Sequence, residues 1–455
     1  MATTQRRSRR RLLGVAAATR RRTSIIGGLL MFTTGIAANA QVEPDRPFRL
    51  GDLYAAVLRA NPKIAGATAL ARAAETRVSG ITRPPDPALQ FGFMNYSLPN
   101  VAPMPAIGMP QLQLMQMIPL GGKLGLAGRA ADAQSSAALA RAEDVKWELR
   151  NQTAMAFYEL YARDRGLDVA RETLRILQDV ERTASAMYRV GERPQADVLR
   201  AQVEIARMVE DTLRMNAMRE AIIAKLNALL DRSSEAGFGV PGLPAFPDTI
   251  PSRATLDSIA FNQRAMVRAA IDDVRAAEAS AVRARKEIWP DVQIGVQLAQ
   301  RGGEMGTERM GSLMVGASIP VFARDRQLKM RDEADAMTQM ARADLASTRA
   351  ETRGAIGEAY ANLRRSRNLI QLYRTTVVPQ AEATAASALA AYRVGRVDFM
   401  TLLDDRMTVN KYRQELYELE ADQGKAWAEL EMLVGRELFD ANRVVAVTTE
   451  ARGGK

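Results

Sequence analysis

The sequence predicts a mainly α-helical protein with a small β part, built from two copies of one structural unit. Helices are favoured because aromatic residues make up only 5% of the 455-residue chain and alanine is abundant. The duplication is visible in YRVGERPQADVL at 188–199, which is followed 204 residues later by YRVGRVDFMTLL at 392–403. With 47% hydrophobic and 25% charged residues, the composition excludes an intrinsically disordered chain.

The first 40 residues have the three parts of a secretion signal. Eight arginines and no acidic residue precede an apolar run at 25–38, and ANA at 38–40 offers a cleavage site before Gln41. Removing these arginines lowers the formal net charge from +11 to +3, so the rest of the chain lacks a nucleic-acid-binding footprint. We therefore expect a signal peptide at 1–40 and no nucleic-acid partner.

The chain contains no cysteine and no histidine. This excludes disulfides, Ser–His and Cys–His catalysis, and zinc sites built on either residue. An enzyme would have to use carboxylates or lysines alone, and the sequence offers no convincing pair of such residues in a cleft-like context. We therefore expect no enzymatic activity, no cofactor and no metal site.

The duplication extends beyond the two turns, at offsets between 201 and 204 residues. PDPALQFGF at 85–93 corresponds to PDVQIGV at 290–296, and MIPL at 117–120 corresponds to SIPV at 318–321. We expect a first repeat at 41–240, a linker at 241–261, a second repeat at 262–436 and a C-terminal tail at 437–455. The segment DRSSEAGFGVPGLPAFPDTIPS at 231–252 overlaps this linker. Its prolines and glycines oppose helix formation, so it should wrap around the outside as loop or short strand.

Each repeat begins with a medium helix, at about 62–83 and about 262–287, and continues with two short strands. The strands are expected at about 88–97 and 111–120 in the first repeat, and at about 291–300 and 312–321 in the second. Their apolar residues alternate with polar or small ones, and the expected lipid-facing set is Leu89, Phe91, Phe93, Val292, Ile294, Val296 and Leu298. Alternation over about ten residues is typical of membrane β-barrel strands, although a half-buried soluble hairpin has the same pattern.

A very long helix follows in each repeat, at about 123–188 and about 325–392. After the turn comes a final helix, at about 194–231 and about 398–435, with apolar residues at the alternating three- and four-residue spacing of helices packed side by side. A 65-residue helix is roughly 100 Å long, which no compact domain of this size requires. We expect four rods per chain: two unbroken helices, and two stacked pairs that join each final helix to a medium helix of the other repeat.

Four strands cannot close a barrel, and an open sheet edge in lipid leaves unpaired backbone groups that cost several kcal/mol each. The chain must therefore share a barrel with copies of itself. Two copies give eight strands and a filled interior, whereas three give twelve strands with a lumen. Three copies also give twelve helical rods, so that a tube of helices can continue the barrel.

The sequence resembles the TolC family of outer-membrane efflux channels. The likeness lies in IPLGGK at 118–123, in both YRVG turns and in the segment 402–435, and it covers nearly all of the mature chain. It implies a homotrimer with a twelve-strand outer-membrane barrel on a periplasmic α-helical barrel, surrounded by an equatorial belt. It also implies a passive exit duct for a tripartite efflux or type I secretion system. The implied partners are outer-membrane lipid, a periplasmic adaptor and an inner-membrane pump of resistance-nodulation-division type.

The resemblance assigns the two turns to the periplasmic tip, where the adaptor binds. The matching residues are Tyr188, Arg189, Val190, Gly191, Tyr392, Arg393, Val394 and Gly395. Asp404 and Asp405 match an acidic pair after the second turn, which we assign to a network at the tip. Two features depart from the family: Gln41 stands where several members carry a lipid-bearing cysteine, and 385–391 lacks the acidic residues that ring the pore in some members.

Methionines cluster around the two expected hairpins, and the likeness is closest to the heavy-metal branch of these channels. Thioethers suit soft ions such as Cu(I), although filling gaps is the commoner role of methionine. The clustered residues are Met94, Met104, Met109, Met115, Met117, Met305, Met310 and Met314. Two other functions stay open at this point: a soluble periplasmic coiled-coil scaffold or adaptor, and a carboxylate-dependent enzyme. The sequence names neither the pump nor the exported compound.

Overall fold

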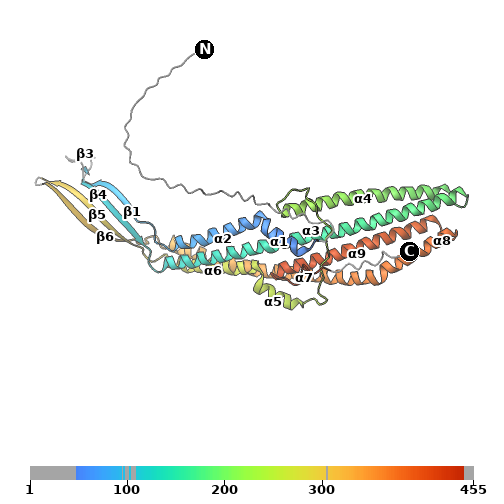
Figure 1. Ribbon diagram of the computed structural model, residues 1–455. Helices are drawn as coiled ribbons and strands as arrows, with labels where there is room; N and C mark the ends of the chain where they lie inside the picture. The colour runs from blue at the N-terminus through green and yellow to red at the C-terminus, as the bar shows by residue number, and fades with distance from the viewer. Residues whose placement is uncertain (1–47, 95, 98–101, 104–108, 304–305, 445–455) are drawn as a thin grey trace, which may run out of the picture. The chain divides into compact units, whose positions relative to one another are not determined.

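The computed structural model describes residues 48–94, 96–97, 102–103, 109–303 and 306–444, all within the compact unit Val42–Lys455 (Figure 1). The expected signal peptide at 1–40, and Met104 and Met305 of the methionine clusters, lie outside the described residues. The expectation of a mainly helical protein with a small antiparallel sheet is confirmed.

Among the described residues, no helix combines the length and the apolar character that crossing a membrane requires.

The first half of the chain contains four helices and four strands in the described residues. The helices are α1 (Leu50–Ala60), α2 (Pro62–Ile81), α3 (Lys123–Arg189) and α4 (Gln195–Leu229). The strands are β1 (Ala88–Met94), β2 (Tyr96–Ser97), β3 (Ala102–Pro103) and β4 (Met109–Ile118). Polar caps fix where helices begin: the Asn61 side chain accepts from the N–H of Lys63 at the start of α2, where Pro62 occupies the first position.

The second half repeats this order of helices and long strands, except that a π-helix interrupts its long helix. Its elements are α5 (Arg253–Gln263), α6 (Ala265–Lys286), β5 (Val292–Gly303), β6 (Gly306–Ala317), α7 (Gln327–Leu372), a π-helix (Tyr373–Val377), α8 (Val378–Arg393) and α9 (Phe399–Val434). Asp398 caps α9 by accepting from the N–H of Thr401 at 2.9 Å, and Gly435 ends it in the left-handed conformation.

Three local features differ from the sequence expectation. Helix α1 lies before the first expected helix at about 62–83, and α5 occupies the end of the linker expected at 241–261. The helical conformation is interrupted between α5 and α6 at Arg264, which has an extended ψ of 124°. The second long helix is interrupted by the π-helix, and Pro379, which has no N–H to donate, lies in the first turn of α8.

The positions of the other helices are most easily described relative to α3 (Figure 1). Near the sheet, α2 packs on α3, α3 on α6, and α6 on α7. Toward the turns, α4 packs on α3, α3 on α9, and α9 on α7 and α8. The expected stacking across repeats is wrong, because α2 and α4 both flank α3 while α6 and α9 both lie between α3 and the α7–α8 helix. Short turns make each final helix an antiparallel neighbour of its own long helix.

A dense core forms at mid-height, where three segments distant in sequence meet. Isolated bridges join Phe48 to Pro241 and Pro244 to Val444, so the N-terminal segment, the linker and the tail lie side by side. Phe48 packs edge-on against Phe157 of α3, with ring centroids 5.3 Å apart. This packing covers only the middle part of α3. We refer to the N-terminal segment, the linker, the tail and α1 together as the belt.

The four long strands form one antiparallel sheet in the order β1-β4-β5-β6, and β2 pairs with β3 separately. In the register, Leu89 pairs with Leu114, Leu114 with Val296, and Val296 with Leu313. The next row on the same face contains Phe91, Leu112 and Leu298. Directly paired residues in a sheet point to the same face, so these rows form one apolar surface.

Candidate functional site

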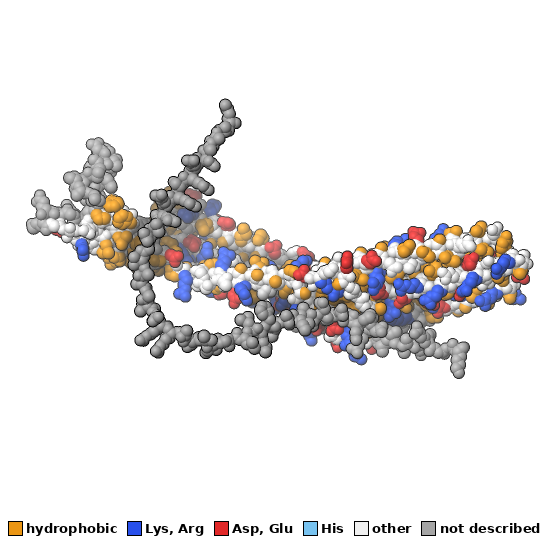
Figure 2. All heavy atoms as spheres, turned by 45° about the horizontal axis from the view of Figure 1, so that its top comes forward, with side chains coloured by type: hydrophobic (Ala, Val, Ile, Leu, Met, Phe, Trp, Pro, Cys, Tyr) orange, Lys and Arg blue, Asp and Glu red, His pale blue; other side chains and the backbone are white. Residues whose placement is uncertain are grey.

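The apolar face of the sheet is exposed. The seven strand residues singled out from the sequence lie on it, and all are exposed except Val292, which is half-buried. Figure 2 shows hydrophobic side chains gathered at the end of the described residues that carries the sheet. A soluble protein rarely exposes an apolar patch of this kind, so the patch marks a surface that contacts something apolar.

The opposite face of the sheet carries a row of polar residues, next to glycines and methionines such as Met115 and Met314. Gln90, Gln113, Gln297 and Ser312 form one row across the four strands. The Gln297 side chain donates a hydrogen bond to Gln111. Some polar residues lie on the apolar face, among them Gln116 opposite Ile294, and Gln300 opposite Arg309 beyond Leu298. The Gln116 amide donates to the carbonyl of Pro85 at 2.8 Å and to that of Met117 at 2.9 Å, which satisfies its hydrogen-bonding groups.

The two YRVG turns have the same backbone. Gly191 and Gly395 have φ of 78° and 75°, a left-handed conformation that glycine adopts without strain. The N–H of Gly191 donates to the Tyr188 carbonyl and that of Gly395 to the Tyr392 carbonyl, both at 3.0 Å. The preceding valines are exposed, Val190 at 71% and Val394 at 68%. Each turn therefore presents an uncovered apolar side chain at its end.

The surroundings of the two turns differ. Tyr188 is 44% exposed, whereas Tyr392 is fully buried, with its ring 5.8 Å from that of Phe399. Arg193, which follows the first turn, stacks over Tyr392 at 4.8 Å and donates to the Val397 carbonyl at 3.0 Å. Burial and the nearby Asp197 raise the pKa of the Tyr392 hydroxyl. The first turn thus holds the second, through an arginine that has no counterpart in the second repeat.

Asp404 and Asp405 lie near the start of α9, Asp404 exposed and Asp405 half-buried. Neither forms an ion pair with any described residue. Ion pairs of α9 occur further along the helix, where Arg413 contacts Glu172 of α3 at 2.9 Å and Glu382 of α8 at 2.5 Å. The acidic pair and the arginine network are therefore separate features of the same helix.

Two buried carboxylates at mid-height were not singled out from the sequence. Glu420 accepts from the hydroxyl of Tyr161 at 2.6 Å and pairs with Arg374 of the π-helix. Glu431 is 2% exposed and accepts from the N–H of Leu438 at 2.7 Å. Burial raises the pKa of Glu431 to about 7. Tyr161 is 259 residues from Glu420, so no local sequence signal could have revealed that contact, and the bonds of Glu431 depend on how the chain folds back after α9.

The described residues hold no group of three or more acidic side chains arranged to bind a metal ion. The chain has no histidine or cysteine that could add to such a group. The candidate features are surfaces: an apolar sheet face, two exposed turns and a belt.

Comparison with known proteins places these features in a wider group. A family model described as outer membrane efflux protein matches residues 53–231 and 257–436. The cobalt-zinc-cadmium resistance protein CzcC of Cupriavidus metallidurans is 24% identical over 301 residues, which are 65% of this chain and 70% of CzcC.

Solved structures share the fold over most of their length. The CusC structure aligns with a TM-score of 0.73 at 16% identity, covering 88% of this chain and 96% of CusC. VceC of Vibrio cholerae aligns with a TM-score of 0.73 at 18% identity, covering 85% and 96%. The outer-membrane channel OprN aligns with a TM-score of 0.71 at 19% identity, covering 86% and 93%.

Proposed function

Because the chain belongs to the outer membrane efflux protein family, we propose that it forms a passive exit duct in the outer membrane. It serves a tripartite efflux or type I secretion system, receives its cargo through an inner-membrane pump and carries out no chemistry. The helices form a tunnel in the periplasm, and the sheet forms part of a membrane barrel. One observation carries the proposal: the sheet has an apolar, exposed face and an opposite face crossed by a row of polar side chains, as a barrel wall between lipid and water requires.

Three copies close the barrel. Among the described residues, β1 and β6 each have one edge without a partner strand, which hydrocarbon does not tolerate. Pairing β6 of one copy with β1 of the next removes both edges, and three copies make a ring wide enough for a lumen. The same step brings α7 and α8 of one copy beside α2 and α4 of the next. The helices then close into a tube under the barrel.

The two repeats, 41–240 and 262–436, supply equal shares of this wall. The family model matches one segment within the first repeat and one that covers the whole of the second, which supports the division. The linker at 241–261 and the tail at 437–455 belong to the belt, and 1–40 is the signal peptide that directs export. The lipid-facing residues are those of the apolar sheet face, including Phe91, Val296 and Leu298.

The turns at 188–191 and 392–395 dock a periplasmic adaptor, which connects the duct to an inner-membrane pump of resistance-nodulation-division type. Val190 and Val394 support this assignment, because each is an exposed apolar side chain at the end of a turn, where a partner can reach it. We assign Asp404 and Asp405 to the same tip region, as polar residues that order the start of α9.

Membrane fractionation tests the duct. We expect the mature protein in the outer-membrane fraction as a trimer that dissociates only on heating, and a conducting pore in planar bilayers. A monomer recovered from the soluble periplasmic fraction would refute the duct and favour a coiled-coil scaffold.

A double substitution tests the tip. Val190→Asp with Val394→Asp should reduce cross-linking to the adaptor by roughly tenfold or more, because a charge replaces each apolar contact. The trimer and its bilayer conductance should persist. Val240→Asp is the matched control, an exposed valine in the belt. Equal loss of cross-linking in the control would argue against docking at the turns.

A further inference from the structure

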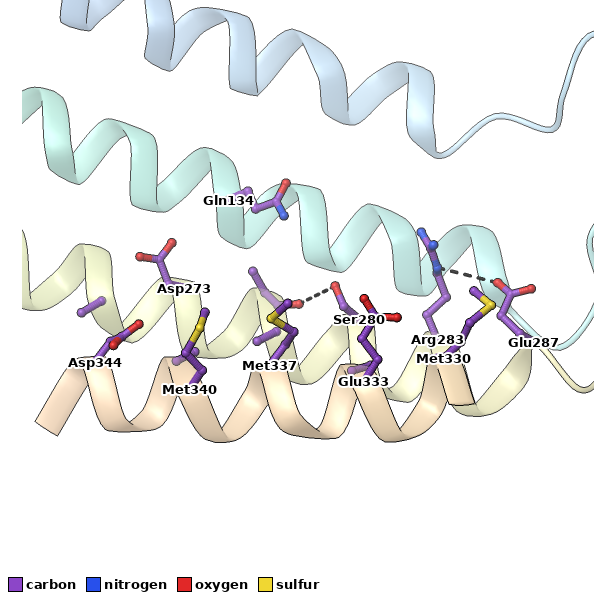
Figure 3. A pocket seen from close by; sticks show the side chains of 16 residues that line it. Gln134, Asp273, Ser280, Arg283, Glu287, Met330, Glu333, Met337, Met340 and Asp344 are labelled. Atoms are coloured by element: carbon purple, nitrogen blue, oxygen red, sulfur yellow. Dashed lines mark hydrogen bonds and ion pairs between the residues drawn. The ribbon is translucent and has the colours of Figure 1, made fainter. Parts of the chain in front are cut away.

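A groove of about 550 Å³ runs between α6 and α7, beside α3 (Figure 3). Its floor is apolar: alanines of α6 face methionines of α7. The methionines are Met330, Met337 and Met340, each at least partly exposed. Carboxylates stand along its rim, and the labelled ones in Figure 3 are Asp273, Glu287, Glu333 and Asp344. Its size is that of pockets that hold drug-sized molecules.

The groove lies on the face of the helices that the belt leaves uncovered. Gln134 is the α3 residue that reaches it, whereas Ser136, Leu139 and Glu143 line a separate hollow together with Leu58 of α1 and Arg436. At 100° per residue, Gln134 points away from those three residues, so the groove and the belt are on opposite faces of α3. A second hollow between α6 and α7 contains the ion pair of Arg285 with Asp335. None of the groove methionines lines this second hollow.

In the proposed duct, a belt surrounds the tube, so the groove faces the lumen. This placement rests on the proposed function, because only a closed tube gives that face a lumen to line. Cargo moving from the tip toward the barrel would then pass the groove. A site on such a path has to bind weakly enough to release what it captures.

The charges of the groove favour a cation. Asp273 is paired with Arg141, and Glu287 lies 3.4 Å from Lys123 and 3.8 Å from Arg283. Glu333 and Asp344 are exposed and form no ion pair with any described residue. Two uncompensated carboxylates therefore flank an apolar floor.

The spacing of the thioethers prevents all three from binding a single soft metal ion. Met330 and Met337 are seven residues apart on α7, which separates their backbones by roughly 10 Å. Figure 3 shows the three side chains spread along the groove and not converging on one point. A long, apolar and negatively edged surface fits an extended molecule better than a point charge, and methionine adapts to varied apolar shapes.

We propose that this groove is a weak binding site for lipophilic organic cations in transit through the duct. The methionines and alanines contact the apolar body of the molecule, and Glu333 and Asp344 attract its charge. A neutral or anionic molecule of the same shape would bind less well.

Fluorescence anisotropy tests the groove on the purified full-length trimer, with rhodamine 6G as the cationic probe and fluorescein as the anionic one. Glu333→Gln with Asp344→Asn should weaken rhodamine 6G binding about fivefold, since each partly exposed charge contributes modestly. Asp332→Asn with Asp335→Asn is the matched control: it removes the same charge from the hollow on the other side of α7 and should leave binding unchanged. Met337→Ala with Met340→Ala should also weaken binding, and the corresponding leucine variants should not.

On a trimer that conducts normally, two results with rhodamine 6G would overturn the proposal, and so would one result with metal ions. One is equal binding by the wild type and the Glu333→Gln, Asp344→Asn variant, and the other is an equal loss in the control. Binding of Ag⁺ or Cd²⁺ to the groove carboxylates, with no binding of rhodamine 6G, would overturn it in favour of a metal-ion site. A preparation that forms neither trimer nor pore would refute the proposed function itself, and the groove proposal would fall with it.

Discussion

Glu431 is expected to make the docking of the C-terminal segment 436–444 dependent on pH. The carboxylate accepts from the N–H of Leu438 at 2.7 Å and from that of Phe439 at 3.3 Å, so it holds the start of the tail in the belt. Arg150 is its nearest cation, at 3.9 Å. Burial, only partly offset by these contacts, raises the pKa of Glu431 from 4.5 to about 7.

The direction of the effect follows from this raised pKa. Between pH 4.5 and pH 7, Glu431 binds a proton in the docked state but not once it is hydrated, so the docked state holds more protons. Docking is therefore most stable below pH 4.5, weakens as the pH rises to 7, and is constant above that. From pH 5 to pH 7.5 the loss is about 2 to 3 kcal/mol, or roughly fiftyfold in the opening equilibrium, if opening hydrates Glu431 fully.

Hydrogen exchange measures this opening. Peptides covering 436–444 should lose protection by up to about fiftyfold between pH 5 and pH 7.5, after correction for the intrinsic exchange rate. In Glu431→Gln, which cannot titrate, protection should be the same at both pH values. Helix α3 peptides from the same samples control for global unfolding. A wild-type tail with pH-independent protection, or a variant with the wild-type pH dependence, would refute the assignment to Glu431.

Three further substitutions have directions that the structure determines. Leu298→Arg should cost about 2 to 4 kcal/mol on the lipid face and lower the yield of outer-membrane trimer, whereas Gln297→Arg on the polar face should be tolerated. Gly424→Ala should lower the melting temperature, with a cost of about 1 to 3 kcal/mol, because its Cβ would lie 2.3 Å from the buried Tyr158 ring; Gly354→Ala, in open space, should stabilise. Arg193→Ala should destabilise the second turn by about 2 kcal/mol. Hydrogen exchange of the variant that is faster at 392–399 than at 188–191 would confirm this loss.

Local periodicity was enough to predict the elements that repeat. Alternation along 89–93 and 292–298 fixes which side chains share a face of a strand, whatever the strand pairs with. The register of the four strands then joins them into one surface. Their contact with lipid stays a prediction, because it depends on copies of the chain that the fold of one copy does not include.

Features that depend on the register between helices could not be predicted. Tyr161 and Glu420 are 259 residues apart, and their hydrogen bond exists only because α3 and α9 pack at that height. The break at Arg264 contains neither proline nor glycine, so no local signal marks it. The end-to-end stacking of α6 and α9 depends on which helices pack against each side of α3. Helix lengths alone do not determine this packing.

The duplicated sequence does not make the two turns equivalent. The first turn joins α3 to α4 and the second joins α8 to α9, so within one chain Arg193 reaches across from the first to the second. At the positions of Arg193 and Asp197, the second repeat has Val397 and Thr401, which cannot return the same contacts. In a trimer, the tip would therefore alternate between turns with an exposed tyrosine and turns with a buried one. An adaptor that docks at all six positions must accept two kinds of surface. The contacts between the partners would then have threefold rather than sixfold symmetry.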